Sequence, residues 1–224
     1  MVWYLCVLAC FGEPIAPVVD APKNVEQKTQ DASSELPTEP IPIQFSFSMQ
    51  LALAGEKLEN PSIRYDPAYV SIAYPNGDVS LDTGVCTDVI IRAYRSFGVD
   101  LQKEIHEDIV RHPKRYPNIR KADTNIDHRR VPNLLAYFAA HGEKLPISHN
   151  ASDYQPGDIV AWKLGGPGGL NHIGLVTSRK STDGERYLMV HNVGYGQVVE
   201  DFLFEEHIFA HYRYIPTHYV SNVQ

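Results

Sequence analysis

The sequence predicts an α+β domain in which a cysteine-bearing helix packs on an antiparallel β-sheet. Apolar residues recur at helical spacing in the first half of the domain, over 46–140. Short apolar runs separated by turn signals fill the second half, over 159–215. Helices that come first and consecutive strands that follow are typical of this fold class.

Four helices are expected, each with apolar residues at helical spacing or clear start and stop signals. They cover residues 46–59, 86–97, 101–110 and 131–140. Gly98 and Gly142 follow the second and the fourth of them, and glycine is common just beyond a helix end. The third must end before Pro113, because proline cannot continue a helix.

The expected strands form two groups. A hairpin is expected early, with strands over 69–74 and 79–81 around a Pro-Asn-Gly-Asp turn. The sheet itself is expected from four strands, at 159–162, 173–178, 187–192 and 211–215. Asp183 and Gly184 supply the turn between the middle two strands. The polar stretch 113–130 is expected to be a loop.

The chain divides into three parts. Residues 1–11 are apolar, too short to span a bilayer and typical of the end of an export signal; residues 7–10 (VLAC) resemble a bacterial lipobox. Residues 12–44 are rich in Pro, Glu, Ser and Thr and are expected to be a disordered linker, with the folded domain at 45–224. We therefore expect an exported protein of the periplasm or cell envelope, with a membrane contact only through a lipid on Cys10.

Composition argues against several classes of protein. The 224 residues carry 20 basic and 27 acidic side chains, a net charge of −7, and no dense basic block, which argues against a nucleic-acid partner. Two of the three cysteines lie in the first ten residues, so neither a disulfide framework nor a cysteine-based zinc site is expected. No cofactor is expected.

Cys86 is the candidate nucleophile, because backbone N–H groups and the dipole at a helix start stabilise a thiolate. His172, which follows the glycine-rich stretch 165–169, is the candidate base; a helix-borne cysteine followed by a strand-borne histidine is the order of papain-like hydrolases. His191 or Asn192 would orient that base, and only one of them can face it, because successive strand residues face opposite sides. We favour His191. The alternatives are a buried structural cysteine and a histidine that merely ends a strand.

The loop before the fourth helix is the densest polar cluster. It holds Asp123, Asn125, Asp127, His128, Arg129 and Arg130. As a substrate site, one of the arginines would clamp a carboxylate and one of the aspartates would meet an amine. The same residues are equally typical of a turn that satisfies itself and caps the helix, and both readings stay open. A metal site is not expected, because the ligand spacing matches no closed site.

Four motifs resemble those of NlpC/P60 cell-wall peptidases. They are residues 84–89 (GVCTDV), 156–162 (PGDIVAW), 172–176 (HIGLV) and 189–191 (MVH). The resemblance implies a papain-like fold, with Cys86 as nucleophile, His172 as base and His191 as the third residue. It also implies a peptidoglycan substrate and an oxyanion-binding tyrosine upstream of the cysteine, for which Tyr74 and Tyr69 are the candidates. The backbone N–H of the cysteine is the other candidate donor.

Residues 65–215 resemble more closely the bacterial domain-of-unknown-function family 1287, which is placed among papain-like hydrolases. The shared strings are residues 82–88 (DTGVCTD), 123–133 (DTNIDHRRVPN) and 191–194 (HNVG). This resemblance implies the fold rather than a substrate. Two residues depart from the NlpC/P60 pattern, Val85 and Asp88, and a carboxylate aimed at the thiol would raise the pKa of Cys86.

These observations together predict an exported cysteine amidase or endopeptidase that cleaves an amide bond in peptidoglycan stem peptides. Two alternatives stay open. One is a non-catalytic module that binds cell wall on the same fold with an inert cysteine. The other is an antibacterial effector hydrolase that acts on neighbouring cells.

Overall fold

The computed structural model describes residues 45–220, so the expected export segment and linker at 1–11 and 12–44 lie outside the described residues. The α-helices are α1 (Phe47–Glu56), α2 (Cys86–Arg95), α3 (Leu101–Arg111), α4 (Val131–His141) and α5 (Thr217–Val220). The strands are β1 (Arg64–Tyr65), β2 (Thr83–Gly84), β3 (Glu143–Lys144), β4 (Ile159–Leu164), β5 (Leu170–Lys180), β6 (Tyr187–Asn192), β7 (Gln197–Glu200) and β8 (His207–Arg213). Within this range no helix is long and apolar enough to cross a membrane.

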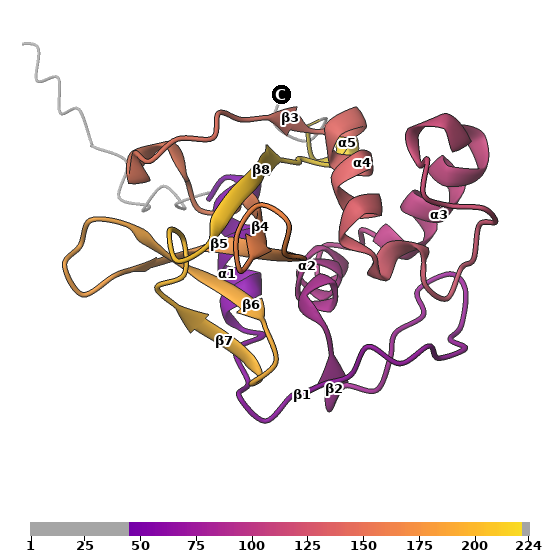
Figure 1. Ribbon diagram of the computed structural model, residues 1–224, viewed down its shortest axis with the longest axis horizontal. Helices are drawn as coiled ribbons and strands as arrows, with labels where there is room; N and C mark the ends of the chain where they lie inside the picture. Colours follow the sequence, from indigo (N-terminus) through magenta and orange to yellow (C-terminus); the bar gives the residue numbers. More distant parts are fainter. Residues whose placement is uncertain (1–44, 221–224) are drawn as a thin grey trace, which may run out of the picture. The chain divides into compact units, whose positions relative to one another are not determined.

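The predicted α+β class with an antiparallel sheet is confirmed. Six strands form one sheet in the order β3-β8-β4-β5-β6-β7, and every neighbouring pair is antiparallel (Figure 1). Strands β4 to β7 follow one another in sequence and in space, as a meander should. Strand β8 then returns to pair with β4 on the other side.

The predicted helices are all present with slightly shifted ends. The α1 helix begins where the Ser46 side chain accepts a hydrogen bond from the Met49 N–H, and α3 begins at Asp100, which accepts from the Lys103 N–H. Side-chain oxygens at these positions satisfy N–H groups that a helix start leaves without partners. The α2 helix ends at Arg95, two residues earlier than predicted.

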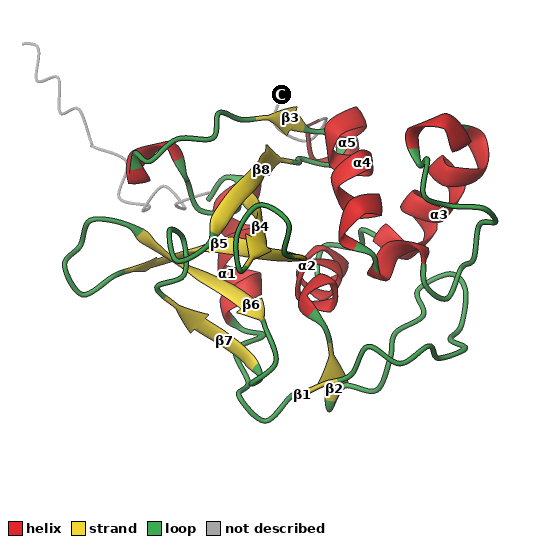
Figure 2. Cartoon of the chain, viewed as in Figure 1, coloured by secondary structure: helices red, strands yellow, loops and turns green. Residues whose placement is uncertain are grey.

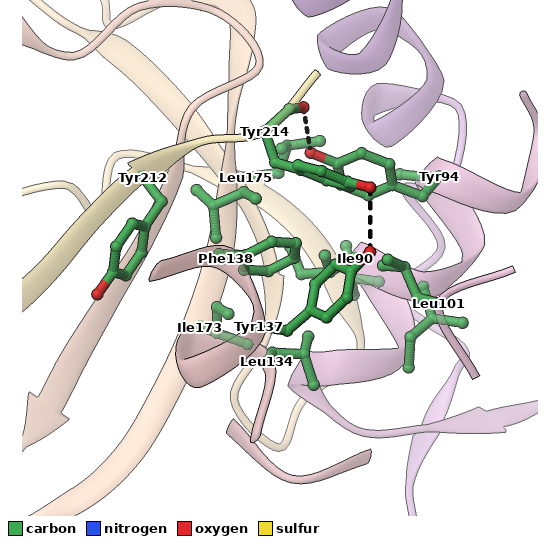
Figure 3. Packing of buried hydrophobic residues seen from close by; sticks show 14 of the residues in the cluster. Ile90, Tyr94, Leu101, Leu134, Tyr137, Phe138, Ile173, Leu175, Tyr212 and Tyr214 are labelled. Atoms are coloured by element: carbon green, nitrogen blue, oxygen red, sulfur yellow. Dashed lines mark hydrogen bonds between the residues drawn. The ribbon is translucent and has the colours of Figure 1, made fainter. Parts of the chain in front are cut away.

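The main core lies between the helices and one face of the sheet. The α1, α2 and α4 helices all contact β5, and α2 also contacts β6 and α3 (Figure 2). Tyr94 of α2 donates to the backbone oxygen of Tyr214 at 2.9 Å, and the hydroxyls of Tyr137 and Tyr214 are 3.1 Å apart (Figure 3). The apolar groups that surround these aromatic rings include Ile90, Leu134 and Leu175. Buried hydroxyls are therefore paired inside an otherwise apolar core.

The opposite face of the sheet has a smaller core built around Trp162. Its indole N–H donates to the backbone oxygen of Leu203 at 3.0 Å, and Val160, Val176 and Met189 complete the cluster. A chain segment after β7 thus covers this face. Both faces of the central strands are buried, which explains why β4 reads as a continuous apolar run.

The predicted hairpin at 69–74 and 79–81 is wrong. Apart from the turn at 74–76, this stretch is irregular, and its neighbours β1 and β2 pair in parallel instead. Tyr69, Val70 and Tyr74 are exposed, so they have no sheet to pack against. Side chains hold the backbone here, because Gln102 bonds the oxygen of Ala73 and the N–H of Gly77.

Several strand predictions were incomplete. Strand β6 has the predicted ends, and β4 and β5 are longer than predicted. Strand β8 starts four residues before the predicted 211–215 strand and ends two residues earlier. Strands β3 and β7 were missed, because two and four residues are too short to show a period.

Candidate active site

Cys86 is the first residue of α2, and β2 leads directly into it. The Val85 N–H donates to Asp88 Oδ2 at 2.7 Å, which fixes the first turn of the helix. The cysteine is 5% exposed, and its sulfur lies against the backbone N–H of Ile173, the residue after His172. The fold thus brings the cysteine to the strand that carries the candidate base. Ile173 packs with Cys86 in the main core, whereas the ring of His172 packs against Trp162, the centre of the smaller core.

The Cys86 thiol is neutral at rest, against the expectation of a thiolate. Burial raises its pKa to about 11, the backbone N–H groups of Ile173 and Thr87 act in the opposite direction, and the Asp88 carboxylate raises it further. The helix start therefore stabilises the thiolate less than burial destabilises it.

Two histidines and a glutamate form a hydrogen-bonded chain across β5, β6 and β7. His172 Nε2 lies 2.7 Å from His191 Nδ1, and His191 Nε2 lies 2.8 Å from Glu200 Oε1. Tyr195 donates its hydroxyl to the same carboxylate oxygen. Glu200 was not predicted; it lies on the short strand β7 that the sequence pattern did not reveal.

The chain of contacts fixes the tautomer of each ring. A carboxylate only accepts hydrogen bonds, so His191 carries its proton on Nε2 and its Nδ1 is an acceptor. His172 must then donate from Nε2, which leaves a lone pair on His172 Nδ1. This is the protonation state that a general base needs.

Both rings are uncharged. Burial lowers the pKa of His172 to about 3, and the neighbouring His191 contributes to the shift. Burial also lowers the pKa of His191, and Glu200 partly opposes this. Trp162 and Phe202 provide the apolar surroundings; the ring centroids of Phe202 and His191 are 4.3 Å apart.

Asn192, the alternative third residue, points to the other face. Its Nδ2 donates to the backbone oxygen of Gly84 at 3.3 Å, and its Oδ1 accepts from the Gly194 N–H at 3.1 Å. Asn192 thus ties the segment before Cys86 to the sheet, whereas His191 contacts His172.

Gly174 allows the two histidine-bearing strands to fit. A Cβ at this position would lie 3.1 Å from the Cβ of His191 and 3.2 Å from the Trp162 ring. These separations are tighter than ordinary van der Waals contact, so a side chain here would push on His191.

Cys86 opens onto a cavity of about 820 Å³. Its lining residues come from the segment around Tyr65, from the start of α2, from residues 118–133 and from Asn171. The cavity therefore joins the cysteine to the polar loop that the sequence singled out. A volume of this size accommodates a short peptide.

Tyr65, on β1, is the tyrosine that lines the cavity beside Cys86. Burial raises the pKa of its hydroxyl, and Cys86 and Asp88 add to the shift. The two tyrosines considered from sequence lie elsewhere: Tyr74 stacks edge-on against His106, and Tyr69 donates to Asp123. Tyr65 was missed because the pairing of β1 with β2 involves only two residues of each strand.

Arg129 has a structural role. It forms a bidentate ion pair with Asp88, with Nε–Oδ1 and Nη2–Oδ2 distances of 3.0 and 2.9 Å, and both side chains are 3% exposed. Arg129 therefore has little freedom to clamp a substrate. The pair links the first turn of α2 to the short 3₁₀ turn at Asp127–Arg129.

Of the other residues in the polar loop 123–130, some form hydrogen bonds within the fold and one, Arg130, is exposed at the cavity. Asp127 pairs with His106 Nδ1 at 2.9 Å and accepts from the Asp123 N–H at 2.8 Å, and Asn125 accepts from a backbone N–H at residue 72. His128 is buried, and its Nδ1 has no partner among the described residues. Arg130 is exposed and lines the cavity.

In the part of the chain that the structure describes, no group of three His, Cys, Asp or Glu residues could hold a metal ion.

Comparisons with known proteins found one family, one relative in sequence and one similar solved structure. Residues 52–214 match the family model described as Domain of unknown function (DUF1287). The chain is similar to the uncharacterized protein YijF of Escherichia coli (strain K12), with 45% identity over 185 residues that cover 81% of this chain and 89% of that protein. A crystal structure of an N-acetylmuramoyl-L-alanine amidase from Bacteroides uniformis resembles it at a TM-score of 0.42 and 13% identity, over 74% of this chain and 98% of that one.

Proposed function

The chain belongs to the DUF1287 family, whose description gives no activity, and we propose from the site itself that it is a cysteine hydrolase with a papain-like fold. In this proposal Cys86 is the nucleophile, His172 the general base and His191 the residue that orients the base. The observation that carries it is the position of Cys86 at the first residue of α2 and at the wall of a cavity, with its sulfur against the backbone of β5, the strand that carries His172.

The reaction starts from an uncharged pair. His172 takes the thiol proton as the sulfur of Cys86 attacks the substrate carbonyl carbon, so that the carbon–sulfur bond forms while charge moves to the carbonyl oxygen. The backbone N–H of Cys86 and the Tyr65 hydroxyl are the donors available to that oxygen.

His172 then completes the cycle as acid and base. It gives its proton to the departing amine as the carbon–nitrogen bond breaks, which leaves a thioester on Cys86. Water, deprotonated by the same histidine, attacks the thioester and releases the acid and the thiol. Each time His172 is protonated, the positive charge is stabilised through His191 by the Glu200 carboxylate.

The proposed substrate is an amide bond in the peptide part of peptidoglycan. The motifs that resemble NlpC/P60 peptidases and the expected export signal support this choice. Within this proposal the protein acts in the periplasm or cell envelope.

One observation favours the alternative of a non-catalytic wall-binding module. Burial raises the pKa of the Cys86 thiol to about 11, as it would for an inert structural cysteine. The cavity would then serve binding alone.

Incubation of the purified protein with isolated peptidoglycan distinguishes the proposed hydrolase from a wall-binding module. Mass spectrometry of the released fragments should detect newly formed termini with wild type and none with Cys86→Ala, with circular dichroism as the control for folding. Equal release by both proteins would refute Cys86 as nucleophile. Binding to peptidoglycan by both, without release by either, would establish the wall-binding module instead.

A further inference from the structure

Three basic side chains gather around the cavity beside Cys86. Arg120, Lys121 and Arg130 line it, and all three are exposed. No ion pair within residues 45–220 involves any of them, although most arginines of the domain are paired. The chain has a net charge of −7, so this concentration of unpaired positive charge runs against its composition.

The carboxylates at this cavity do not neutralise the three cations. Asp127 is bound by His106, and Asp88, which is buried and does not line the cavity, is bound by Arg129. Asp123 accepts hydrogen bonds from Tyr69 and from the backbone and side chain of Asn125. These acidic groups are therefore held by partners within the fold, whereas the basic groups are free for a ligand.

We propose that Arg120, Lys121 and Arg130 form a subsite that binds a carboxylate of the substrate close to the scissile amide. This inference rests on the proposed function, because the same cavity contains the nucleophile. A guanidinium presents a planar pair of donors that matches a carboxylate, and an ammonium adds a mobile charge beside it. The substrate class is thus a peptide with an acidic side chain or terminus, and neutral or cationic peptides are disfavoured.

Two of the three residues could not be singled out from sequence. The string at 123–130 drew attention to Arg129, which the fold uses to neutralise Asp88. Arg120 and Lys121 precede that string in an unremarkable polar stretch, and the fold of the 118–133 segment turns them to the cavity.

Site-resolved alkylation of Cys86 tests the subsite with two reagents of similar size. Iodoacetate carries a carboxylate and iodoacetamide does not, and mass spectrometry of the Cys86 peptide separates this thiol from Cys6 and Cys10. The test variant replaces Arg120, Lys121 and Arg130 by Gln. The matched control replaces the exposed lysines Lys57, Lys144 and Lys180 by Gln, so that the net charge changes equally.

At low ionic strength the ratio of the iodoacetate rate to the iodoacetamide rate should fall roughly five-fold in the test variant and stay unchanged in the control. In wild type the same ratio should fall as salt is added. An equal ratio in wild type and test variant would overturn the subsite.

An unreactive Cys86 would refute the proposed function but not the subsite. Isothermal titration calorimetry tests the subsite in that case. On a Cys86→Ala background, the blocked dipeptide N-acetyl-glycyl-glutamate α-amide should bind more tightly than N-acetyl-glycyl-glutamine α-amide, which has no carboxylate, and the substitutions at Arg120, Lys121 and Arg130 should abolish the difference. Equal binding of the two dipeptides would overturn the subsite independently of any reaction.

Discussion

Cys86 and His172 start the proposed reaction without charge, unlike a preformed thiolate–imidazolium pair. Burial raises the pKa of the thiol to about 11 and lowers that of the imidazole to about 3. Proton transfer therefore accompanies attack on the substrate rather than preceding it. The rate then depends most on His191 and Glu200, because these hydrogen-bonded partners of His172 stabilise the charge that appears on its ring.

Glu200 is the residue that should control this charge from outside the cavity. Replacing Glu200 by Gln keeps the shape but lets the amide donate as well as accept, so the protonation of His191 is no longer fixed. We expect kcat/KM to fall roughly ten-fold or more with KM nearly unchanged, as measured by release of peptidoglycan fragments. Glu205→Gln, at a nearby exposed position, is the control; equal activity of both variants would contradict the role of Glu200.

Sequence alone led to Cys86, His172 and His191, because each stands in a motif that resembles a known one, and the structure brings these three segments together. It could not lead to Glu200 or Tyr65. Their strands are four and two residues long, and what positions them is pairing with a distant segment rather than any local pattern.

At the scale of elements, the first turn of α2 is fixed by the buried pair of Asp88 and Arg129. Arg129→Ala would leave the Asp88 carboxylate buried without its partner, so we expect a loss of about 3 to 5 kcal/mol in the free energy of unfolding. Urea denaturation measures this loss directly.

Arg130→Ala is the matched control for that prediction, because Arg130 is the exposed neighbour of Arg129 and makes no ion pair within the described residues. We expect a change below about 0.5 kcal/mol for this variant. Similar losses for the two variants would mean that the ion pair does not hold the loop to α2.

Helices and strands could be predicted where burial of one face makes apolar residues recur at regular spacing, and could not be predicted elsewhere. Strand β6 and the four main helices pack on the core, and their apolar spacing shows it. The segment 69–74 alternates in the same way, but Tyr69, Val70 and Tyr74 are exposed, and side-chain bonds from Gln102 and Asn125 determine the path of the chain there. Alternation alone therefore indicates a strand only where a sheet is available to pair with it.

For the whole molecule, three buried neutral histidines predict sensitivity to acid. Burial lowers the pKa of His128 to about 4 and of His172 to about 3, and it lowers that of His191 as well. Below about pH 6.5 the unfolded chain binds protons at these residues and the folded protein does not, so stability is lost as the pH falls from 6.5 towards 4.

His128→Phe isolates one of these contributions without touching the cavity. The ring is buried and its Nδ1 has no partner among the described residues, so phenylalanine removes a titrating group and no hydrogen bond to that atom. Between pH 7 and pH 5 the variant should lose about 2 kcal/mol less stability than wild type in urea denaturation. An unchanged pH dependence would show that His128 titrates normally in the folded protein.

The central claim is that His172 activates Cys86, and the alkylation rate of Cys86 by iodoacetamide at pH 7.5 tests it most directly. Mass spectrometry of the Cys86 peptide gives the rate in wild type, in His172→Ala and in His207→Ala, which removes an exposed histidine outside the site. The account predicts a loss of about a hundred-fold for His172→Ala alone. Equal rates in all three proteins would contradict it and leave Cys86 as a structural thiol.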